Sequence, residues 1–316
     1  MKILVTGCCG FIGSSVALRL LNMGYTVIGI DNFDDYYNID IKQKRCNILL
    51  EKDNFIFEKN DIVNSDIINR LKPHKVCHLA SKAGVRNSLL YPSSYVKNNI
   101  EGFTNLLDQA VKNNIQNFVY ASSSSVYGLN NKVPFSETDN INSCNSPYAA
   151  SKRSMEVFAS TYNQLYNLPL IGLRFFTVYG PDGRPDMAPY KFIKSIINGE
   201  KFQKYGTGES MRDYTYIDDI VDGIIASLEN TKNIKCELIN LGNSTPVTLN
   251  HFIETCEIVT NKKAVYDQVG DQLGDVPITY ADITKAKELL NYSPKVKLVD
   301  GLRNTYEWFI DNKIEN

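Results

Sequence analysis

A turn with three evenly spaced glycines near the start of the chain is the feature that most constrains the fold. Residues 3–6 form a short apolar run, and the next seven residues read Gly-Cys-Cys-Gly-Phe-Ile-Gly, ahead of an amphipathic segment at 15–23. A strand, a glycine turn and a helix in this order let the backbone approach a pyrophosphate at a helix N-terminus. The turn therefore predicts a dinucleotide site, with a purely structural turn as the alternative. We assign its cofactor contacts to Gly7, Gly10, Phe11, Ile12 and Gly13.

Short apolar runs alternate with helical patterns through the first half of the chain. Strands are expected at residues 3–6, 26–30, 55–57, 76–79, 118–121 and 170–173, and helices at 15–23, 95–112 and 148–166. This alternation predicts a parallel sheet that is covered by helices on both faces. The predicted fold class is α/β, a doubly wound parallel sheet (Rossmann), and ligands bind such sheets at the carboxyl ends of the strands.

The pattern changes after Gly180, where residues 180–186 form a loop dense in Pro and Gly. A helix at 191–198 and a segment rich in Gly, Tyr and Asp at 205–219 follow. We expect a cofactor domain at 1–180 and a smaller C-terminal α/β substrate-binding lobe at 181–316. Part of 213–243 is expected to return to the first domain.

Two aspartates follow the second and third expected strands. Asp31 stands about 20 residues after the turn, where a carboxylate accepts hydrogen bonds from a ribose diol and repels a 2′-phosphate. The position favours NAD over NADP. Asp61 is a candidate partner of the adenine, and a solvated helix cap is the alternative.

A tyrosine and a lysine four residues apart, Tyr148 and Lys152, are the candidate acid/base pair. On a helix they share one face, so the ammonium can lower the pKa of the phenol. The spacing alone is weak evidence because the chain has 19 tyrosines, and Tyr190 with Lys194 repeats it. The first pair is distinguished by four serines at 122–125, one of which could share the proton of a substrate hydroxyl. A polar loop is the alternative for these serines.

Composition excludes several classes of function. With 34 basic and 35 acidic residues in 316, the chain offers no basic field for nucleic acid. Seven scattered cysteines and three histidines predict reduced thiols and no metal site. No apolar stretch approaches the roughly 20 residues that span a bilayer, so we expect no membrane partner and a cytoplasmic location.

Motifs along nearly the whole chain match one family. They lie at residues 7–13, 31–33, 79–86, 99, 122–128, 148–152, 174–180 and 212–219. Together they resemble the nucleotide-sugar epimerases of the extended short-chain dehydrogenase/reductase family, from residue 2 to about residue 302. The chain most resembles the UDP-glucuronate 4-epimerases, through DNFDDYY at 31–37, AGVRNS at 83–88, SSSSVYG at 122–128 and RFFTVYGPDGRPDMA at 174–188.

The resemblance implies an isomerase of carbohydrate metabolism that uses NAD to epimerise a UDP-sugar, for example for polysaccharide biosynthesis. It implies that Ser123, Tyr148 and Lys152 are catalytic. Further implied cofactor contacts, besides the glycine turn, Asp31, Asp61, Tyr148 and Lys152, are Asn32, Ile62, Leu79, Ala80, Lys82 and Asn99. The implied substrate contacts are Arg86, Ser124, Ser125, Thr177, Arg184, Arg212 and Asp275. Family members are commonly homodimers, so we expect one here, with helices near 95–112 and 148–166 in contact.

Two serines favour epimerisation over the other reactions of the family. Members that dehydrate or decarboxylate the sugar commonly carry acidic residues after the catalytic hydroxyl, where this chain has Ser124 and Ser125. UDP-glucuronate and UDP-galacturonate are the preferred pair because Arg184 can bind a carboxylate, although it could instead pair with Asp182 or Asp186.

Other substrates and functions stay open from the sequence. Thr279 stands where strict glucose epimerases carry a bulkier tyrosine, so UDP-N-acetylglucosamine is an alternative beside UDP-glucose, and Gln272 replaces an arginine of the galactose-type epimerases. A dehydratase, a decarboxylase or a non-catalytic NAD-binding regulator is less favoured. Cys8 and Cys9 replace small residues of the turn and are expected to pack as apolar side chains.

Overall fold

A seven-stranded parallel sheet forms the centre of the molecule in the computed structural model, which describes residues 1–141, 143–230, 235–270 and 276–312. Its strands are β1 (Lys2–Thr6), β2 (Thr26–Asp31), β3 (Phe55–Lys59), β4 (Lys75–His78), β5 (Asn117–Ser123), β6 (Leu170–Phe175) and β10 (Cys236–Leu241). They lie in the order β10-β6-β5-β4-β1-β2-β3. The predicted doubly wound α/β fold is confirmed.

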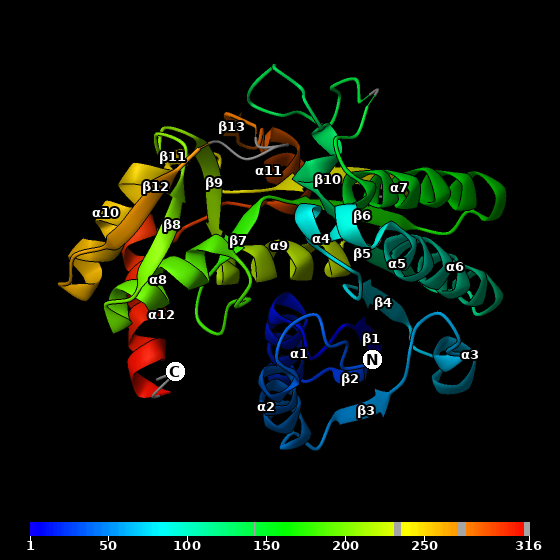
Figure 1. Ribbon diagram of the computed structural model, residues 1–316. Helices are drawn as coiled ribbons and strands as arrows, with labels where there is room; N and C mark the ends of the chain where they lie inside the picture. The colour runs from blue at the N-terminus through cyan, green and yellow to red at the C-terminus, as the bar shows by residue number, and fades with distance from the viewer. Residues whose placement is uncertain (142, 231–234, 271–275, 313–316) are drawn as a thin grey trace.

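The strand order reverses between β1 and β4, which pair directly although β2 and β3 separate them in the chain. The chain first winds outward to β3, then crosses back and winds outward again to β10 (Figure 1). Such a reversal leaves a crevice beyond the carboxyl ends of the two central strands, because the connections on either side run to opposite faces.

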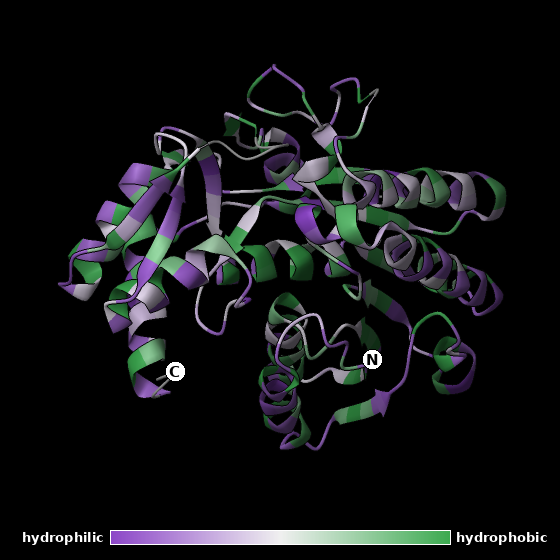
Figure 2. Ribbon diagram, viewed as in Figure 1, coloured by the Kyte–Doolittle hydropathy of each residue, from purple (hydrophilic) through white to green (hydrophobic). Residues whose placement is uncertain are grey.

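Helices cover both faces of the sheet. The helices α1 (Phe11–Asn22), α2 (Ile39–Leu50) and α9 (Ile217–Glu229) pack in one buried apolar cluster, and α3 (Ile67–Leu71), α6 (Gly102–Lys112) and α7 (Pro147–Tyr166) pack in a second. Figure 2 shows α9 hydrophobic along most of its length, whereas α6 and α7 carry mixed colours. The buried strands therefore read as continuous apolar runs, since neither face meets water.

Two expected elements differ in detail from the structure. The helix expected at 95–112 consists of α5 (Pro92–Tyr95), a π-helical turn η1 (Val96–Glu101) and α6. The π-helical turn contains Asn99, whose buried side chain bonds to the loop after β4, and this tertiary contact is invisible to helical periodicity. The segment 205–219 contains a strand, β9 (Met211–Tyr216), whose buried polar residues conceal its pattern.

The remaining elements form a smaller lobe beside the carboxyl edge of the sheet (Figure 1). A small sheet joins β7 (Thr177–Tyr179), β9, β11 (Pro246–Thr248) and β13 (Ile278–Thr279), and β8 (Lys201–Tyr205) pairs with β12 (Val265–Val269). The lobe's helices are α8 (Ala188–Asn198), α10 (Leu249–Thr260) and α12 (Leu298–Asp311). Among the described residues, no helix is long and apolar enough to cross a membrane.

Three short helices complete the regular structure of the described residues. They are α4 (Val85–Leu90), the 3-10 helix η2 (Ser124–Tyr127) and α11 (Thr284–Leu290). The first two begin just beyond β4 and β5, so their N-terminal residues lie at the carboxyl edge of the sheet. Strand β10 and helix α9, although they follow residue 181, belong to the large sheet and to one of its faces.

Candidate functional site

A pocket of about 400 Å³ opens at the carboxyl ends of the central strands. Eighteen of the predicted site residues line it: Gly7, Gly10, Phe11, Ile12, Gly13, Asp31, Asn32, Ile62, Leu79, Ala80, Lys82, Ser123, Ser124, Ser125, Tyr148, Lys152, Thr177 and Arg184. Motifs far apart in the sequence therefore converge on one cavity. Asp61, Asn99, Arg86 and Arg212 do not line it, and Gln272 and Asp275 lie outside the described residues.

At the glycine turn, the backbone of Gly7, Gly10 and Gly13 forms one end of the pocket. Gly7 has φ 69°, and a Cβ at Gly13 would lie 2.0 Å from the carbonyl oxygen of Gly7. Helix α1 begins at Phe11 with Gly10 as its N-cap, and no side chain caps it. Its first amides are thus available to an anion, and the cradle fits a dinucleotide pyrophosphate.

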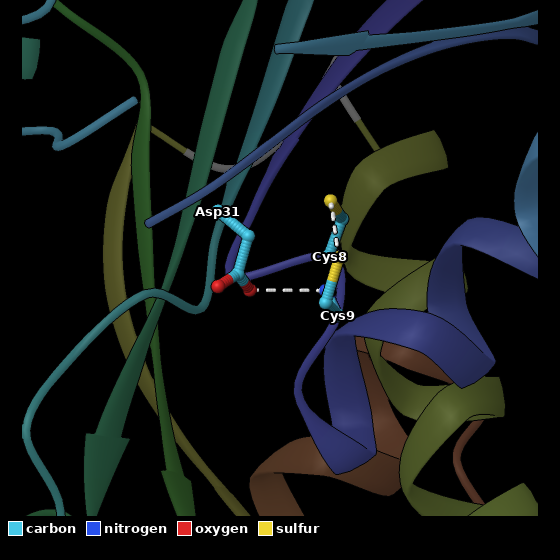
Figure 3. Close-up of side chains that lie close together, drawn as sticks. All are labelled: Cys8, Cys9 and Asp31. Carbon is cyan, nitrogen blue, oxygen red and sulfur yellow. Dashed lines mark hydrogen bonds between the residues drawn. The ribbon is translucent and has the colours of Figure 1, made fainter. Parts of the chain in front are cut away.

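Asp31 ends β2 beside this turn with its carboxylate held in place. One oxygen accepts a hydrogen bond from the backbone N–H of Cys9 at 3.0 Å, and the other accepts one from Phe33 at 2.9 Å. Figure 3 shows the first of these contacts, with the carboxylate directed at the turn. The side chain is buried and lines the pocket, so a ribose diol is its natural partner.

Cys8, Cys9 and Asp31 form a buried group whose potential ligand atoms lie within 4.8 Å of one another (Figure 3). The two sulfurs are 3.8 Å apart. Burial raises the pKa of Cys8, and the hydrogen bond with Cys8 together with burial raises the pKa of Cys9. Both cysteines are buried, so in this structure they pack under the turn as small side chains.

Asp61 and Asn99 support the pocket from behind its lining. The Asp61 carboxylate accepts hydrogen bonds from the side chain of Asn32 at 3.0 Å and from the backbone of Val63 at 2.9 Å. The Asn99 amide bonds to both the N–H and the carbonyl of Lys82, at 2.8 and 2.9 Å. These two side chains thus fix pocket-lining residues, and Lys82 in turn pairs with Asp34 at 2.6 Å.

Tyr148 and Lys152 reach the pocket from the first turns of α7. Pro147 occupies the first turn of this helix and the hydroxyl of Ser146 caps it by accepting from the N–H of Ala149 at 3.1 Å, which fixes where the helix starts. The ammonium of Lys152 donates to the hydroxyl of Ser81 at 3.0 Å and to the carbonyl of Ala121 at 2.7 Å. The repeated spacing at Tyr190 and Lys194 lies on α8, away from this pocket.

Burial sets the protonation of this pair. It lowers the pKa of Lys152 to about 7, with the charge of Glu156 acting in the opposite direction. Burial also raises the pKa of Tyr148, while a hydrogen bond with Ser123 and the charge of Arg184 act to lower it. Ser123 and Tyr148 therefore interact directly, and Lys152 lines the same pocket, where a proton can move between the phenol and a bound hydroxyl.

A buried ion pair behind Lys152 is a part of the site that sequence reasoning missed. Glu156, one helical turn beyond Lys152, receives two hydrogen bonds from the Arg174 guanidinium, at 2.8 and 2.9 Å. It also accepts one from the hydroxyl of Ser122 at 2.7 Å. The i, i+4 spacing from Lys152 was the available signal, but its partner Arg174 lies on β6 and only the fold brings them together.

The opposite end of the pocket is lined by hydroxyls and one guanidinium. Ser124 and Ser125 begin η2, where the hydroxyl of Ser123 accepts from the N–H of Ser125 at 3.1 Å, and Thr177 begins β7. Arg184 lies in the loop between β7 and α8 and forms a two-pronged pair with Asp186, at 3.0 and 2.6 Å. It therefore lines the pocket and forms the alternative ion pair, with Asp186, while binding of a carboxylate stays a prediction.

Two predicted substrate arginines lie outside the lining. The Arg86 guanidinium, on α4, lies 5.4 Å from the centre of the Tyr205 ring at the end of β8. Arg212 lies on β9, where it donates to the carbonyl of Met211 at 2.9 Å and stands opposite Thr279 of β13. Both positions belong to the junction between the large sheet and the smaller lobe.

Comparisons with known proteins agree with this geometry. The family model described as GDP-mannose 4,6 dehydratase matches residues 4–305. An uncharacterised protein of Methanocaldococcus jannaschii is 46% identical over 99% of this chain and 97% of its own length, and the UDP-glucuronate 4-epimerase of Thermodesulfobacterium geofontis is 42% identical over 98% and 96%. The crystal structure of UDP-glucuronic acid 4-epimerase from Bacillus cereus, in complex with UDP-glucuronic acid and NAD, superposes with a TM-score of 0.93 at 38% identity, covering 99% of this chain and all of that one.

Proposed function

The chain belongs to the GDP-mannose 4,6-dehydratase family, within the extended short-chain dehydrogenases/reductases, and we propose that it is an NAD-dependent UDP-glucuronate 4-epimerase. One observation carries the proposal: Ser123, Tyr148 and Lys152 line the same pocket as Arg184 and the hydroxyls of residues 124, 125 and 177. A tyrosine acid/base and an anchor for a carboxylate thus serve one cavity.

The residues at the glycine end fit NAD. The turn at 7–13 would hold the pyrophosphate, Asp31 the adenosine ribose, and Tyr148 with Lys152 the far end of the cofactor. When bound, the nicotinamide accepts a hydride from a sugar carbon and later returns it. Asn32, Ile62, Leu79, Ala80 and Lys82 form the walls, and Asp61 and Asn99 hold those walls in place.

Proton transfer is the work of the chain's own residues. Tyr148, as phenolate, removes the proton of the C4 hydroxyl directly or through the hydroxyl of Ser123, and the positive charge of Lys152 favours that phenolate. Inversion then requires the 4-keto sugar to turn about its anchored diphosphate and to present its other face. Tyr148 returns the proton when the C4 oxygen is reduced again. If Tyr148→Phe keeps near-normal turnover, this mechanism is wrong.

The residues after Ser123 explain why the reaction stops at epimerisation. Ser124 and Ser125 offer hydroxyls, and neither can remove a further proton as a carboxylate would. Arg184, Thr177 and these two serines would hold the uronate carboxylate before and after the ring turns, which restrains its loss from a 4-keto sugar. We retain Arg86, Arg212 and Asp275 as proposed contacts of the UDP.

The test is a substrate panel read by the anomeric proton signals of each C4 epimer. The protein is mixed separately with UDP-glucuronate, UDP-glucose and UDP-N-acetylglucosamine, and only the uronate should convert efficiently. Arg184→Ala should lower turnover of the uronate about 100-fold, as expected for loss of a charge-assisted pair. Conversion of the neutral sugars alone would overturn the assignment of the carboxylate subsite.

We also propose that the enzyme is a cytoplasmic homodimer. Large apolar side chains are exposed along α7 and along the adjoining segment from α4 to η1: Val157, Phe158, Leu165, Tyr166, Leu89, Leu90, Tyr91 and Val96. Contiguous exposed apolar surface marks an interaction site, and two such helical faces suit a second copy of the chain. The seven free cysteines support a reducing compartment. Sedimentation should give a dimer, and Leu165→Glu should give a monomer.

A further inference from the structure

The loop that carries Arg184 is anchored firmly at its base. The guanidinium of Arg45, a buried residue of α2, donates to the side chain of Asp182 at 2.6 Å and to its carbonyl at 2.5 Å. The same guanidinium donates to the hydroxyl of Tyr37 at 2.9 Å and to the carbonyl of Cys9 at 3.3 Å. The loop backbone at Asp182, two residues before Arg184, is thereby tied to the glycine turn.

Arg184 has a ready partner beside the pocket. Its guanidinium meets both carboxylate oxygens of Asp186 and lies 5.5 Å from the centre of the Tyr36 ring, which also lines the pocket. The hydroxyl of Tyr36 is confined in turn, because a Cβ at Gly84 would lie 2.7 Å from it. Asp186 thus presents to Arg184 the same planar, two-oxygen acceptor that a uronate carboxylate would present.

A sugar that must turn within the site cannot keep one set of hydrogen bonds throughout. Its C5 carboxylate has to leave Arg184 when the 4-keto ring exchanges faces, and a guanidinium left without an anion in a closed pocket is costly. A second carboxylate within reach of the same side chain removes that cost. An unpaired arginine would instead hold the carboxylate in the ground state and oppose the turn.

We propose that Asp186 is an exchange partner for the substrate carboxylate: Arg184 leaves Asp186 when the uronate binds and returns to it while the 4-keto sugar turns. The inference rests on the proposed function, because only a uronate can compete for Arg184. A neutral UDP-hexose leaves the Arg184–Asp186 pair intact. Asp186 is therefore a specificity-determining and positioning residue that need not touch the reacting carbon.

The binding test uses the NAD-loaded protein with Tyr148→Phe, which removes turnover. Titration calorimetry should show that adding Asp186→Asn tightens UDP-glucuronate about tenfold and changes UDP-glucose by less than about twofold. The control Asp300→Asn breaks an exposed pair with Arg303 on α12 and should change neither affinity. In an Arg184→Gln background, Asp186→Asn should have no further effect, since the two residues act as one pair.

The kinetic test uses Asp186→Asn with Tyr148 intact. We expect kcat and KM for UDP-glucuronate to fall together, each by about tenfold, because the carboxylate is held more tightly and released less readily. If Asp186→Asn binds UDP-glucuronate more weakly, Asp186 only orients Arg184. If the variant binds it more tightly with unchanged kcat, the ring turns without the help of Asp186. Either result overturns the proposal. Failure of the proposed function is read separately, as absence of uronate conversion by the unmodified protein.

Discussion

The two ends of the pocket are built in different ways. At the glycine end the backbone itself forms the wall, and a Cβ at Gly13 has no room beside the Gly7 carbonyl. At the other end, which we call the sugar end, the wall consists of the side chains of Ser124, Ser125, Thr177 and Arg184, and Asp186 pairs with Arg184 beside the pocket. A ligand that stays in place is thus met by fixed backbone, and a ligand that must turn is met by side chains with alternative partners.

The fixed end should tolerate the least change, and Gly13→Ala tests this most severely. The added methyl group would lie 2.0 Å from the Gly7 oxygen, so the turn or α1 must shift. We expect loss of bound NAD and a free energy of unfolding lower by about 3 kcal/mol or more. Urea unfolding and the NAD content of the purified protein measure the two effects.

Gly270→Ala is the matched control, because a Cβ at Gly270 meets nothing within 4 Å. Its free energy of unfolding should stay within about 0.5 kcal/mol of the unmodified protein. If Gly13→Ala behaves like this control, the contrast between a fixed and an adaptable end is wrong.

Breaking the buried ion pair between Glu156 and Arg174 should have the next largest effect on stability. Glu156→Gln leaves the buried Arg174 without an anion, so we expect the free energy of unfolding to fall by about 3 kcal/mol. Arg153 also pairs with the Glu156 carboxylate, but the Arg153 side chain is partly exposed. Arg153→Gln should therefore lower the free energy of unfolding by about 1 kcal/mol or less. Equal losses, measured by urea unfolding, would show that burial does not decide the strength of these pairs.

Asp31→Asn probes a charged side chain that bonds to the glycine turn. The amide keeps its bulk but loses its charge, so NAD should bind about tenfold more weakly and the preference over NADP should shrink. Calorimetric titration of both dinucleotides measures this. Asp53→Asn, in an exposed turn before β3, is the control and should leave NAD affinity as it was. If Asp31→Asn leaves the ratio of the affinities for NAD and NADP unchanged, Asp31 does not determine which cofactor binds.

The prediction with the smallest change per measured step is a pH dependence due to Lys152. Its pKa is about 7 in the folded protein and 10.5 in the unfolded chain, so between these values the unfolded chain binds the extra proton. The ligand-free protein should therefore gain stability as pH rises through this window, by on the order of 1 kcal/mol per pH unit from this group. Lys152→Met should lack that contribution, and the difference between the two urea-unfolding series isolates it. Parallel curves would contradict the lowered pKa.

The glycine end was predictable from sequence because its determinants are local. Gly7 to Gly13 are consecutive along the chain, and Asp31 follows the next strand, so spacing alone places them together. The alternation of strands and helices likewise predicted the order and type of the main elements. For Tyr148 and Lys152 the spacing alone was not enough, because Tyr190 and Lys194 have the same spacing. The serines upstream of the first pair distinguish it from the second.

The sugar end was less predictable because its pairs join distant segments. The spacing of Arg184 and Asp186 allowed a contact, but only the fold shows that Arg184 also lines the pocket. Arg45 and Asp182 are 137 positions apart, and no local pattern relates them. The strand β9 was missed for a similar reason: its buried Asp213 is satisfied by three backbone N–H groups from later in the chain.

Strand β10 affects the order in which parts of the chain can fold during synthesis. It pairs with β6 along the whole of residues 236–241, yet residues 176–235 lie between the two strands in the sequence. Until that stretch has been synthesised, the outer backbone groups of β6 have no partner and can pair with another chain. The cofactor half is therefore encoded first but is among the last parts to be finished, and a nascent chain needs protection at this edge until its sugar-selecting half exists.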